Sequence, residues 1–478
     1  MLFNSGVFVI FFIIVYSLYL LLNKQLRWQN ALLLVASYVF YGRWNWRFLT
    51  LIAISTLVDY YLGRAIYQTP NDTPANQQHR KRLLLTSMTV NLGILGFFKY
   101  FNFFADSFTD LLNLIGFTAD PLTLNIILPV GISFYTFQTM SYTIDIYRGK
   151  LEPAHNLLNF AVFVAFFPQL VAGPIERAVN LLPQVRQPRR ITLQQINVGL
   201  YLILWGLFKK MVIADNAGQI ADQIFNNYTE YKDLEILIGI LAFAIQIYGD
   251  FSGYSLVARG LSKLMGFELM VNFRLPYFAL NPTDFWQRWH ISLSSWLRDY
   301  LYIPLGGNRG GKWQTYRNLM ITMVLGGLWH GAAWNFVLWG AFHGAILIIY
   351  RMLEKRPIHQ DPWNGSINYL VILSRMILMF SLTLFGWLLF RAHSLAQISY
   401  MITHISFASS NTSLNLGKEL LFYTTPLFII ELGQYLTRDL LWLTKWVRPV
   451  RVVGYSFILA LIFTFGVRES LEFIYFQF

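Results

Sequence analysis

"NLMITMVLGGLWHGAAWNFVLWGAFHGAILIIY", residues 318–350, contains no Asp, Glu, Lys or Arg. A continuous helix over this stretch is about 50 Å long, whereas the hydrocarbon core of a bilayer is about 30 Å thick. The stretch therefore enters a membrane and either tilts strongly or breaks. Gly326, Gly327 and Gly331 offer the break. The pairs Gly327–Gly331 and Gly340–Gly344 have the small-xxx-small spacing that lets helices approach closely.

His330 lies inside this uncharged stretch. A helix that begins at Asn318 places His330 about 18 Å along its axis, near the midplane of a bilayer. A polar side chain at that depth is costly unless it pairs with another polar group or lines a wet cavity. A purely packing role is one alternative, and it suits His343 better because His343 is nearer the far end. The functional interpretation is that His330 lines a passage into the membrane and takes up a proton.

The composition of the whole chain agrees with a membrane protein. Of 478 residues, 55% are hydrophobic and 13% are charged, against about 25% charged in soluble domains. Residues 1–23 carry no charge and read as a first transmembrane helix rather than a cleaved signal. Further apolar runs predict about 11 to 13 membrane helices, several too short to cross alone. With no internal repeat and no long polar loop, we expect one all-α polytopic transmembrane domain over residues 1–478.

The net charge of +13 comes from Lys and Arg scattered through short loops, with the densest clusters at residues 77–82 and 186–190. Basic short loops are what the positive-inside rule predicts for cytoplasmic connections, so we expect the excess charge to set membrane topology and not to bind nucleic acid. The chain has no Cys, which excludes disulfides, thiolate metal sites and a cysteine nucleophile. We expect no metal site and no bound cofactor.

Residues 271–312 differ from the stretches on either side. They are rich in Trp and Tyr, moderately charged, and bounded by Pro and Gly, which is typical of a segment at the membrane–water boundary. We predict an interfacial helix near 282–303. The sub-stretch "GGNRGGK", residues 306–312, has the glycine and lysine spacing of a phosphate-binding loop, but Trp313 replaces the required Ser or Thr, so we interpret it as a plain loop.

The predicted interfacial helix turns His290 away from its charged edge. At helical spacing Trp286, His290 and Ser294 share one face, whereas Asp284 and Arg288 lie on another. An interfacial histidine without a function belongs on the charged face. We therefore treat His290 as a candidate functional residue.

Asp250 is a third polar residue in an apolar setting. It lies in "QIYGDFSGYS", residues 246–255, and is the one charged residue of the run 236–258. A carboxylate at that depth either stays protonated or finds a partner. A site at the edge of a cavity and a role in pinning two helices together are both open.

Taken together, four ordered motifs resemble the membrane-bound O-acyltransferase family, and within it the bacterial branch typified by the alginate O-acetylation protein. The resemblance is dense over residues 166–344 and extends, by length and helix count, over nearly the whole chain. The motifs are "FFPQLVAGPIER" (166–177), "QIYGDFSGYS" (246–255), "NFRLPYFALNPTDFWQRWHISLSSWLRDYLYIPLGGNR" (272–309) and "LGGLWHGAAWNFVLWGAFHG" (325–344).

The resemblance implies a bundle of helices around a central funnel or tunnel, with an acyl donor entering from one side and an acceptor from the other. His330 takes the place of the family's membrane-embedded histidine, and His290 takes the place of an upstream polar partner; both are expected to be catalytic. Asp250, Trp329 and Asn272 lie in the same motifs and are candidate substrate-binding or supporting residues.

The function implied by the resemblance is O-acetyl transfer in the bacterial inner membrane. The expected donor is cytoplasmic acetyl-CoA. The expected acceptor is an envelope polysaccharide of the alginate type, or a periplasmic hydrolase-like transferase that completes the transfer. Peptidoglycan O-acetylation and teichoic-acid D-alanylation are alternatives that use the same chemistry.

Two other classes of protein stay open on the residues alone. Asp250, His290 and His330 also suit the proton relay of a proton-coupled transporter, although the lack of repeats and the Trp-rich interfacial segment count against it. A purely structural scaffold predicts that both histidines tolerate substitution.

Overall fold

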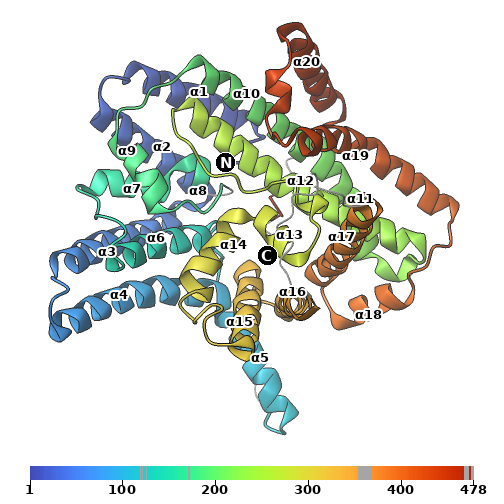
Figure 1. Ribbon diagram of the computed structural model, residues 1–478, viewed down its shortest axis with the longest axis horizontal. Helices are drawn as coiled ribbons and strands as arrows, with labels where there is room; N and C mark the ends of the chain where they lie inside the picture. Colours follow the sequence, from blue (N-terminus) through green and yellow to red (C-terminus); the bar gives the residue numbers. More distant parts are fainter. Residues whose placement is uncertain are drawn as a thin grey trace. The chain divides into compact units, whose positions relative to one another are not determined.

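The computed structural model describes residues 1–118, 120, 122–124, 126–170, 173–353, 369–467 and 473–474, and in these residues every regular element is a helix (Figure 1). The first ten α-helices are α1 (Gly6–Leu21), α2 (Leu26–Asn45), α3 (Leu49–Gln68), α4 (Pro74–Leu95), α5 (Phe101–Leu114), α6 (Ile132–Tyr147), α7 (Leu157–Ala165), α8 (Phe167–Leu170), α9 (Ala178–Arg186) and α10 (Leu193–Phe208). The others are α11 (Asp215–Asn226), α12 (Leu234–Leu264), α13 (Pro282–Arg288), α14 (Ile291–Leu297), α15 (Lys312–His330), α16 (Trp334–Leu353), α17 (Tyr369–Arg391), α18 (Leu395–Thr403), α19 (Asn411–Thr437) and α20 (Arg448–Phe465). Three π-helical turns, η2 (Gly96–Tyr100), η3 (Lys209–Ala214) and η6 (Arg298–Tyr302), and four short 3-10 turns, η1 (Trp46–Phe48), η4 (Tyr228–Glu230), η5 (Pro276–Phe278) and η7 (Trp442–Lys445), complete the described elements. The all-α prediction is confirmed.

The chain forms two compact units. The first comprises residues 1–200 and 258–270, and the second comprises residues 201–257 and 271–478. The chain therefore passes between the units at three points. The single domain expected over residues 1–478 stays a prediction.

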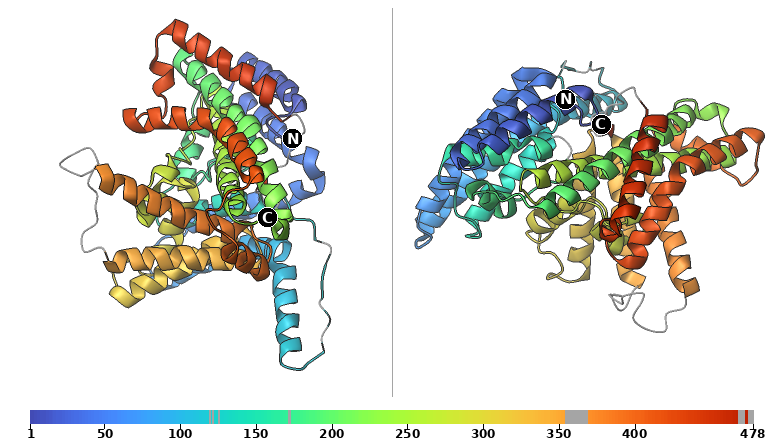
Figure 2. Two further views of the ribbon diagram at one scale, coloured as in Figure 1. Left: turned by 90° about the vertical axis from the view of Figure 1, so that its right-hand side faces the viewer. Right: turned by 90° about the horizontal axis from the view of Figure 1, so that it is seen from above.

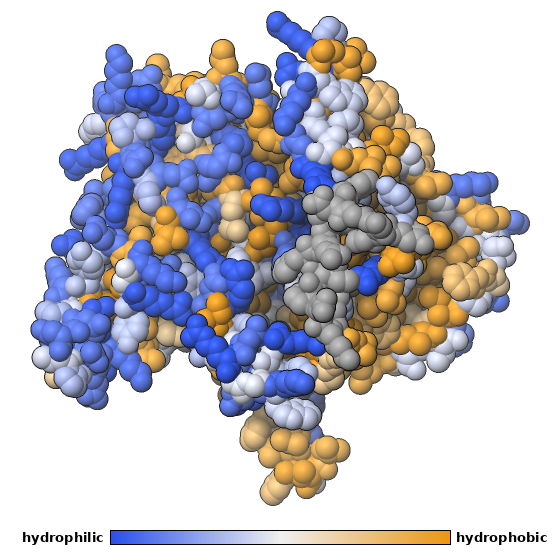
Figure 3. Space-filling view, viewed as in Figure 1, coloured by the Kyte–Doolittle hydropathy of each residue, from blue (hydrophilic) through white to orange (hydrophobic). Residues whose placement is uncertain are grey.

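Within the described residues, seven helical segments are long and apolar enough to cross a membrane, and α1 and the segment 157–170 are shorter apolar helices. Three of the seven are composite, because α2 continues into α3, α4 continues into α5, and α10 continues through η3 into α11. Large hydrophobic side chains are exposed along them. In the space-filling view the end of α5 is hydrophobic, and Phe108 and Leu114 there are 60% and 83% exposed (Figure 3). A water-exposed surface of this kind is unfavourable, whereas lipid covers it. The chain is a multi-pass membrane protein.

Polar N-cap residues fix where several helices begin. Thr73 accepts a hydrogen bond from the Asn76 backbone at 3.2 Å and is followed by Pro74, which suits the first position of α4. Asn281 caps α13 in the same way, accepting from the Asp284 backbone at 2.8 Å. These caps satisfy backbone N–H groups that a helix leaves without partners.

In the first unit α3, α4 and α6 pack side by side around buried polar groups (Figure 2). Ser87 donates a 2.6 Å hydrogen bond to the carboxylate of Asp59, and Asn91 donates a 2.9 Å bond to its other oxygen. All three side chains are buried. Hydrogen bonds between helices replace the hydrophobic driving force that lipid does not supply.

In the second unit the uncharged stretch 318–350 forms a helical hairpin, as the glycines predict. The break falls at Gly331, whose backbone is extended between α15 and α16. A Cβ atom on Gly327 would lie 2.1 Å from the Phe336 carbonyl oxygen, and one on Gly340 would lie 2.4 Å from the Met323 carbonyl oxygen. The close approach of the two helices therefore depends on glycine at both positions.

Candidate active site around His330

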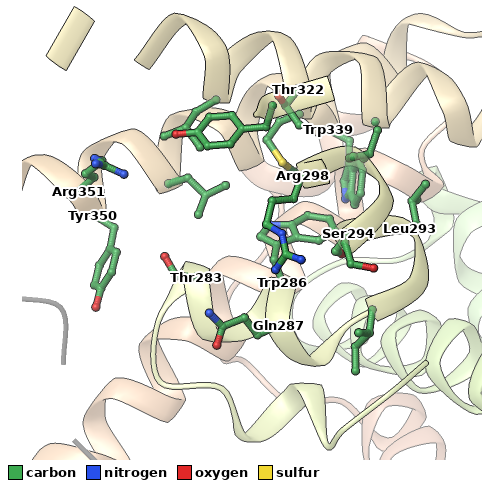
Figure 4. Close-up of a pocket in the computed structure, with 18 of the residues that line it drawn as sticks. Thr283, Trp286, Gln287, Leu293, Ser294, Arg298, Thr322, Trp339, Tyr350 and Arg351 are labelled. Carbon is green, nitrogen blue, oxygen red and sulfur yellow. The ribbon is translucent and has the colours of Figure 1, made fainter. Parts of the chain in front are cut away.

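His330 is the last residue of α15, which begins at Lys312 and not at Asn318. Its side chain is buried and lines a cavity of about 790 Å³ within the second unit. The cavity is bounded by α13, α14, α15 and α16 (Figure 4). On α15 its lining residues follow one helical face, at 319, 322, 323, 326 and 330. The cavity therefore runs along α15 for about 16 Å and ends at His330.

Aromatic side chains surround the imidazole of His330. Its ring centroid lies 5.1 Å from that of Trp329, 5.0 Å from that of Trp339 and 5.5 Å from that of Phe390, all in edge-to-face arrangements. Trp339 lines the same cavity, and Trp329 is buried behind it. These rings hold the imidazole in one orientation and keep water away from most of its surface.

The helix predicted near 282–303 forms in two parts, because residues 289–290 leave the helical conformation; the expectation of a continuous helix is corrected. α13 ends at Arg288, Trp289 is extended, His290 is left-handed with φ 43° and ψ 54°, and α14 begins at Ile291. A left-handed backbone is uncommon for a residue other than glycine and marks a position that its surroundings over-determine.

Asn272 supplies the reason for the break. Its backbone oxygen accepts from the Ile291 N–H at 2.9 Å, and its side-chain oxygen accepts from the Ser292 N–H at 3.2 Å and from the Ser292 hydroxyl at 2.9 Å. These bonds satisfy the N–H groups at the start of α14. The Asn272 amide also donates to Ser255 on α12 at 3.3 Å. Asn272 therefore fixes the turn that carries His290 onto α12.

The break moves His290 out of the face predicted for it. Trp286 and Ser294, its expected neighbours on that face, line the cavity, whereas His290 does not. Its side chain is 0% exposed and packs against Phe251 with ring centroids 4.6 Å apart. Burial lowers the pKa of His290 to about 3, so the imidazole is neutral at physiological pH.

The structure still brings the two histidines together. Their ring centroids are 6.2 Å apart, and Trp329 contacts both, with centroids 5.6 Å from His290 and 5.1 Å from His330. Of the candidate residues, His290, His330, Trp329 and Asn272 thus form one cluster. All four were candidates from the sequence, and of these only His330 lines the cavity.

The sequence left open whether Asp250 stays protonated or pairs with another group, and in the structure it pairs with Lys210. The ammonium group of Lys210 lies 2.8 Å from the carboxylates of both Asp250 and Asp215, and all three side chains are buried. The second oxygen of Asp250 accepts a 2.7 Å bond from the Ile474 backbone. Asp250 therefore joins α12 to η3, α11 and the segment 473–474, and it does not line the His330 cavity.

Lys210 was not predicted as the partner of Asp250, because the sequence around it shows nothing more specific than two consecutive lysines. Lys209, the residue before it, points to a different partner and forms a 2.6 Å ion pair with Glu431 on α19. Both lysines lie on the π-helical turn η3, and such turns often mark sites that a regular helix cannot build.

Two tryptophans that line the cavity were not among the candidates from the sequence. The indole N–H groups of Trp286 and Trp339 are buried and have no hydrogen-bond acceptor among the described residues. Both side chains line the cavity with His330. A buried N–H group without an acceptor is costly, so these two donors are ready to bind an oxygen atom of a ligand. Among the described residues no cluster of His, Asp or Glu suits a metal ion.

A family model described as the membrane-bound O-acyltransferase family matches residues 43–389, which include both histidines and the whole cavity. The chain belongs to the membrane-bound O-acyltransferase family. Chains of this family transfer acyl groups to oxygen, and this chain is an O-acyltransferase. The family resemblance drawn from the four motifs is confirmed.

Three curated relatives place the chain within the family. It is 43% identical over 411 residues to the probable alginate O-acetylase AlgI of Pseudomonas aeruginosa, covering 85% of this chain and 75% of that protein. It is 37% identical over 382 residues to the peptidoglycan O-acetyltransferase of Helicobacter pylori, covering 73% of this chain and 70% of that protein. The teichoic acid D-alanyltransferase of Bacillus subtilis is 28% identical over 278 residues, covering 56% of this chain and 69% of that protein.

The motif at 166–177 belongs to the first unit and not to the unit that holds the cavity. Its Glu176 is buried and accepts a hydrogen bond from the Met270 backbone. Residues 171–172 of this motif lie outside the described residues. The described part of the motif therefore has a structural contact within its own unit.

Proposed function

We propose that this acyltransferase moves an acetyl group from acetyl-CoA to a hydroxyl group of an alginate-type envelope polysaccharide, or to a periplasmic protein that passes it on. The observation that carries the proposal is the position of His330. It is the one histidine among the residues that line the cavity, and it lies where α15 ends. The two kinds of relative with identities above 30% are named as O-acetylating enzymes.

In the proposed step His330 acts as general base. A nitrogen of its imidazole takes the proton of the acceptor hydroxyl as the oxygen attacks the thioester carbonyl carbon. The carbon–sulfur bond then breaks, and the proton passes from the imidazolium to the departing thiolate. A positioned base of this kind accelerates the reaction by about 10²–10⁴-fold. The surrounding aromatic rings exclude water, which would otherwise hydrolyse the thioester.

The attack places negative charge on the carbonyl oxygen. Trp286 and Trp339 line the same cavity and carry buried indole N–H groups with no acceptor in the described part of the chain. We assign these groups to the carbonyl oxygen as hydrogen-bond donors. His290, expected from the sequence to take part directly, is buried behind His330, so we assign it a positioning role through the rings that it shares with His330.

The named activities of the relatives support the choice of acceptor. The alginate relatives are 41–44% identical to this chain, the peptidoglycan enzyme 37% and the D-alanyl enzyme 28%, and we propose the acceptor in that order of preference. A hydrolase-like partner in the periplasm would complete the transfer to polymer, with this protein in the inner membrane. The chain is an O-acyltransferase, which the transporter alternative does not explain.

The proposal is tested with purified protein in lipid vesicles. Wild-type protein is expected to release free CoA thiol from acetyl-CoA when an uronate oligosaccharide is supplied, and to label that oligosaccharide with acetyl. His330→Ala is expected to lower the rate by about 10²–10⁴-fold. His79→Ala is the matched control, because His79 is exposed on α4 in the other unit.

Four results would overturn the proposal or part of it. Full activity of His330→Ala would show that His330 takes no part in the transfer. Faster acetyl transfer to peptidoglycan fragments than to uronate chains would show that the acceptor is peptidoglycan. Faster transfer of D-alanine than of acetyl would show that the acyl group is D-alanyl. A wild-type protein inactive with all of these would require a different donor.

A further inference from the structure

The His330 cavity has a second end, which carries an arginine. Arg351 lines the cavity near the C-terminal end of α16, and Trp339, which contacts His330, lies twelve residues before it. That separation is about 18 Å along a helix. In Figure 4 Tyr350 and Arg351 lie on one side of the cavity, away from Trp339. The cavity therefore joins a base at one end to a fixed positive charge at the other.

Arg351 is held in place by a neutral group, so its positive charge can attract an anion. Its guanidinium donates a 3.1 Å hydrogen bond to the side-chain oxygen of Asn308, which also accepts from the Tyr302 hydroxyl. Tyr302 and Asn308 line the cavity as well. In the described part of the chain the hydrogen-bond acceptor of Arg351 is a neutral amide and not a carboxylate. We call Tyr302, Asn308 and Arg351 the arginine mouth.

The surroundings of the arginine mouth are basic. Between residues 298 and 317 the chain has four basic side chains and one acidic side chain, Asp299, which is already paired with Arg298 at 2.7 Å. Arg309 and Arg317 are exposed there. Such a charge balance attracts anions, and the positive-inside rule assigns it to the cytoplasmic side of the membrane.

We propose that the arginine mouth binds a phosphate group of the acyl donor, while the thioester of the same molecule reaches His330. This inference rests on the proposed function and adds the donor-binding residues to it. An extended chain of about 13 covalent bonds joins the sulfur of a CoA thioester to its first phosphate and spans about 15 Å. The spacing between Arg351 and Trp339 matches that length once the arginine side chain is included.

The walls between the two ends suit such an arm. Gln287, Ser294 and Thr322 line the cavity beside Leu293, Met323 and Leu347. The amides of the donor arm need hydrogen-bond partners, and its methyl groups need apolar contacts. A uronate carboxylate of the acceptor would also bind an arginine, so the experiment must separate the two sources of negative charge.

The test compares two donors with one set of variants. Acetyl-CoA carries the phosphates, and acetyl-pantetheine has the same thioester arm without them. Arg351→Gln is expected to raise the KM for acetyl-CoA about tenfold or more while the KM for acetyl-pantetheine stays unchanged. Arg351→Lys keeps the charge and is expected to recover part of the loss. Arg82→Gln, at an exposed arginine on α4 in the other unit, is the matched control and should leave both values unchanged.

The outcomes separate the two proposals. If wild-type protein acetylates the acceptor but Arg351→Gln leaves the KM for acetyl-CoA unchanged, the arginine mouth does not bind the donor and the proposed function stands. If the KM for the uronate acceptor rises instead, the mouth binds the acceptor carboxylate and the inference is wrong. A parallel rise for both donors would also overturn it, because the phosphates would then not matter. If wild-type protein does not use acetyl-CoA, both proposals fall together.

Discussion

The rings of His290 and His330 lie 6.2 Å apart, centroid to centroid, yet His330 lines the cavity and His290 is sealed behind it. Trp329 contacts both rings. The pair therefore has one member that can meet a substrate and one that supports it. This division decides what substitution of each residue should do.

His290→Asn tests the supporting role. Asn is the non-glycine residue type that most readily adopts the left-handed backbone seen at this position, so the turn is expected to form. The smaller side chain loosens the packing around His330. We expect kcat to fall about tenfold with little change in KM, a much smaller loss than that of His330→Ala. Steady-state kinetics of both variants in vesicles measures this. Equal losses in the two variants would mean that His290 takes part in the chemistry directly.

The stability of the protein should fall in mild acid because of the same residue. Burial lowers the pKa of His290 to about 3, whereas an unfolded histidine has a pKa of about 6.5. Below about pH 6.5 the unfolded chain binds a proton that the folded chain refuses. The stabilisation is therefore complete above that pH and declines as the pH falls, by up to about 1.4 kcal/mol per pH unit. Thermal unfolding in detergent between pH 7.5 and 5 should show a steeper decline for wild type than for His290→Asn. Parallel declines would contradict the assignment.

Local sequence rules predicted the hairpin of α15 and α16 well. The uncharged length exceeded one membrane crossing, and the structure breaks at Gly331 and packs closely at Gly327 and Gly340. Both outcomes depend on residues close together in the chain. The break before α14 could not be predicted in this way. It needs the hydrogen bonds of Asn272, eighteen or more residues away, and those outweigh the helical pattern of residues 282–303.

The partners of buried charged residues also could not be predicted from nearby residues in the sequence. The sequence showed that Asp250 needs a partner or a proton, but Lys210 lies forty residues earlier and meets it only because η3 packs against α12. The arginine mouth likewise combines Tyr302 and Asn308 with Arg351, which lies on a different element. Sequence patterns thus identified the costly groups, and the packing of helices decided what each one contacts.

The tight hairpin predicts a specific cost for a methyl group. A Cβ atom at position 340 would lie 2.4 Å from the Met323 carbonyl oxygen, so Gly340→Ala must push α15 and α16 apart. We expect a loss of about 1–3 kcal/mol in stability and a lower transfer rate. Gly93→Ala is the control, since a Cβ atom there meets nothing within 4 Å and alanine favours a helix. Thermal unfolding of the two variants measures the difference. A Gly340→Ala protein as stable as Gly93→Ala would show that the helices can separate freely.

The buried charges of Lys210, Asp215 and Asp250 depend on one another. Lys210→Met leaves two buried carboxylates close together without their cation, and we expect a loss of about 3–5 kcal/mol. Lys445→Met breaks an ion pair with Asp439 in which the lysine side chain is 74% exposed, so it should cost about 0–1 kcal/mol. Chemical or thermal unfolding in the same detergent compares them. Adding Asp250→Asn to Lys210→Met should recover part of the loss. No recovery would mean that the damage is not electrostatic.

The indole donors of the cavity make a kinetic prediction. Trp339→Phe keeps an aromatic ring beside His330 but removes the N–H group assigned to the carbonyl oxygen. Because that hydrogen bond strengthens as charge develops in the transition state, kcat should fall about 10²–10³-fold while KM changes little. Trp286→Phe is expected to behave alike. Trp313→Phe is the control, because Trp313 is 82% exposed at the far end of α15. A rise in KM with an unchanged kcat would show instead that the tryptophans bind the donor before the reaction and do not stabilise the developing charge.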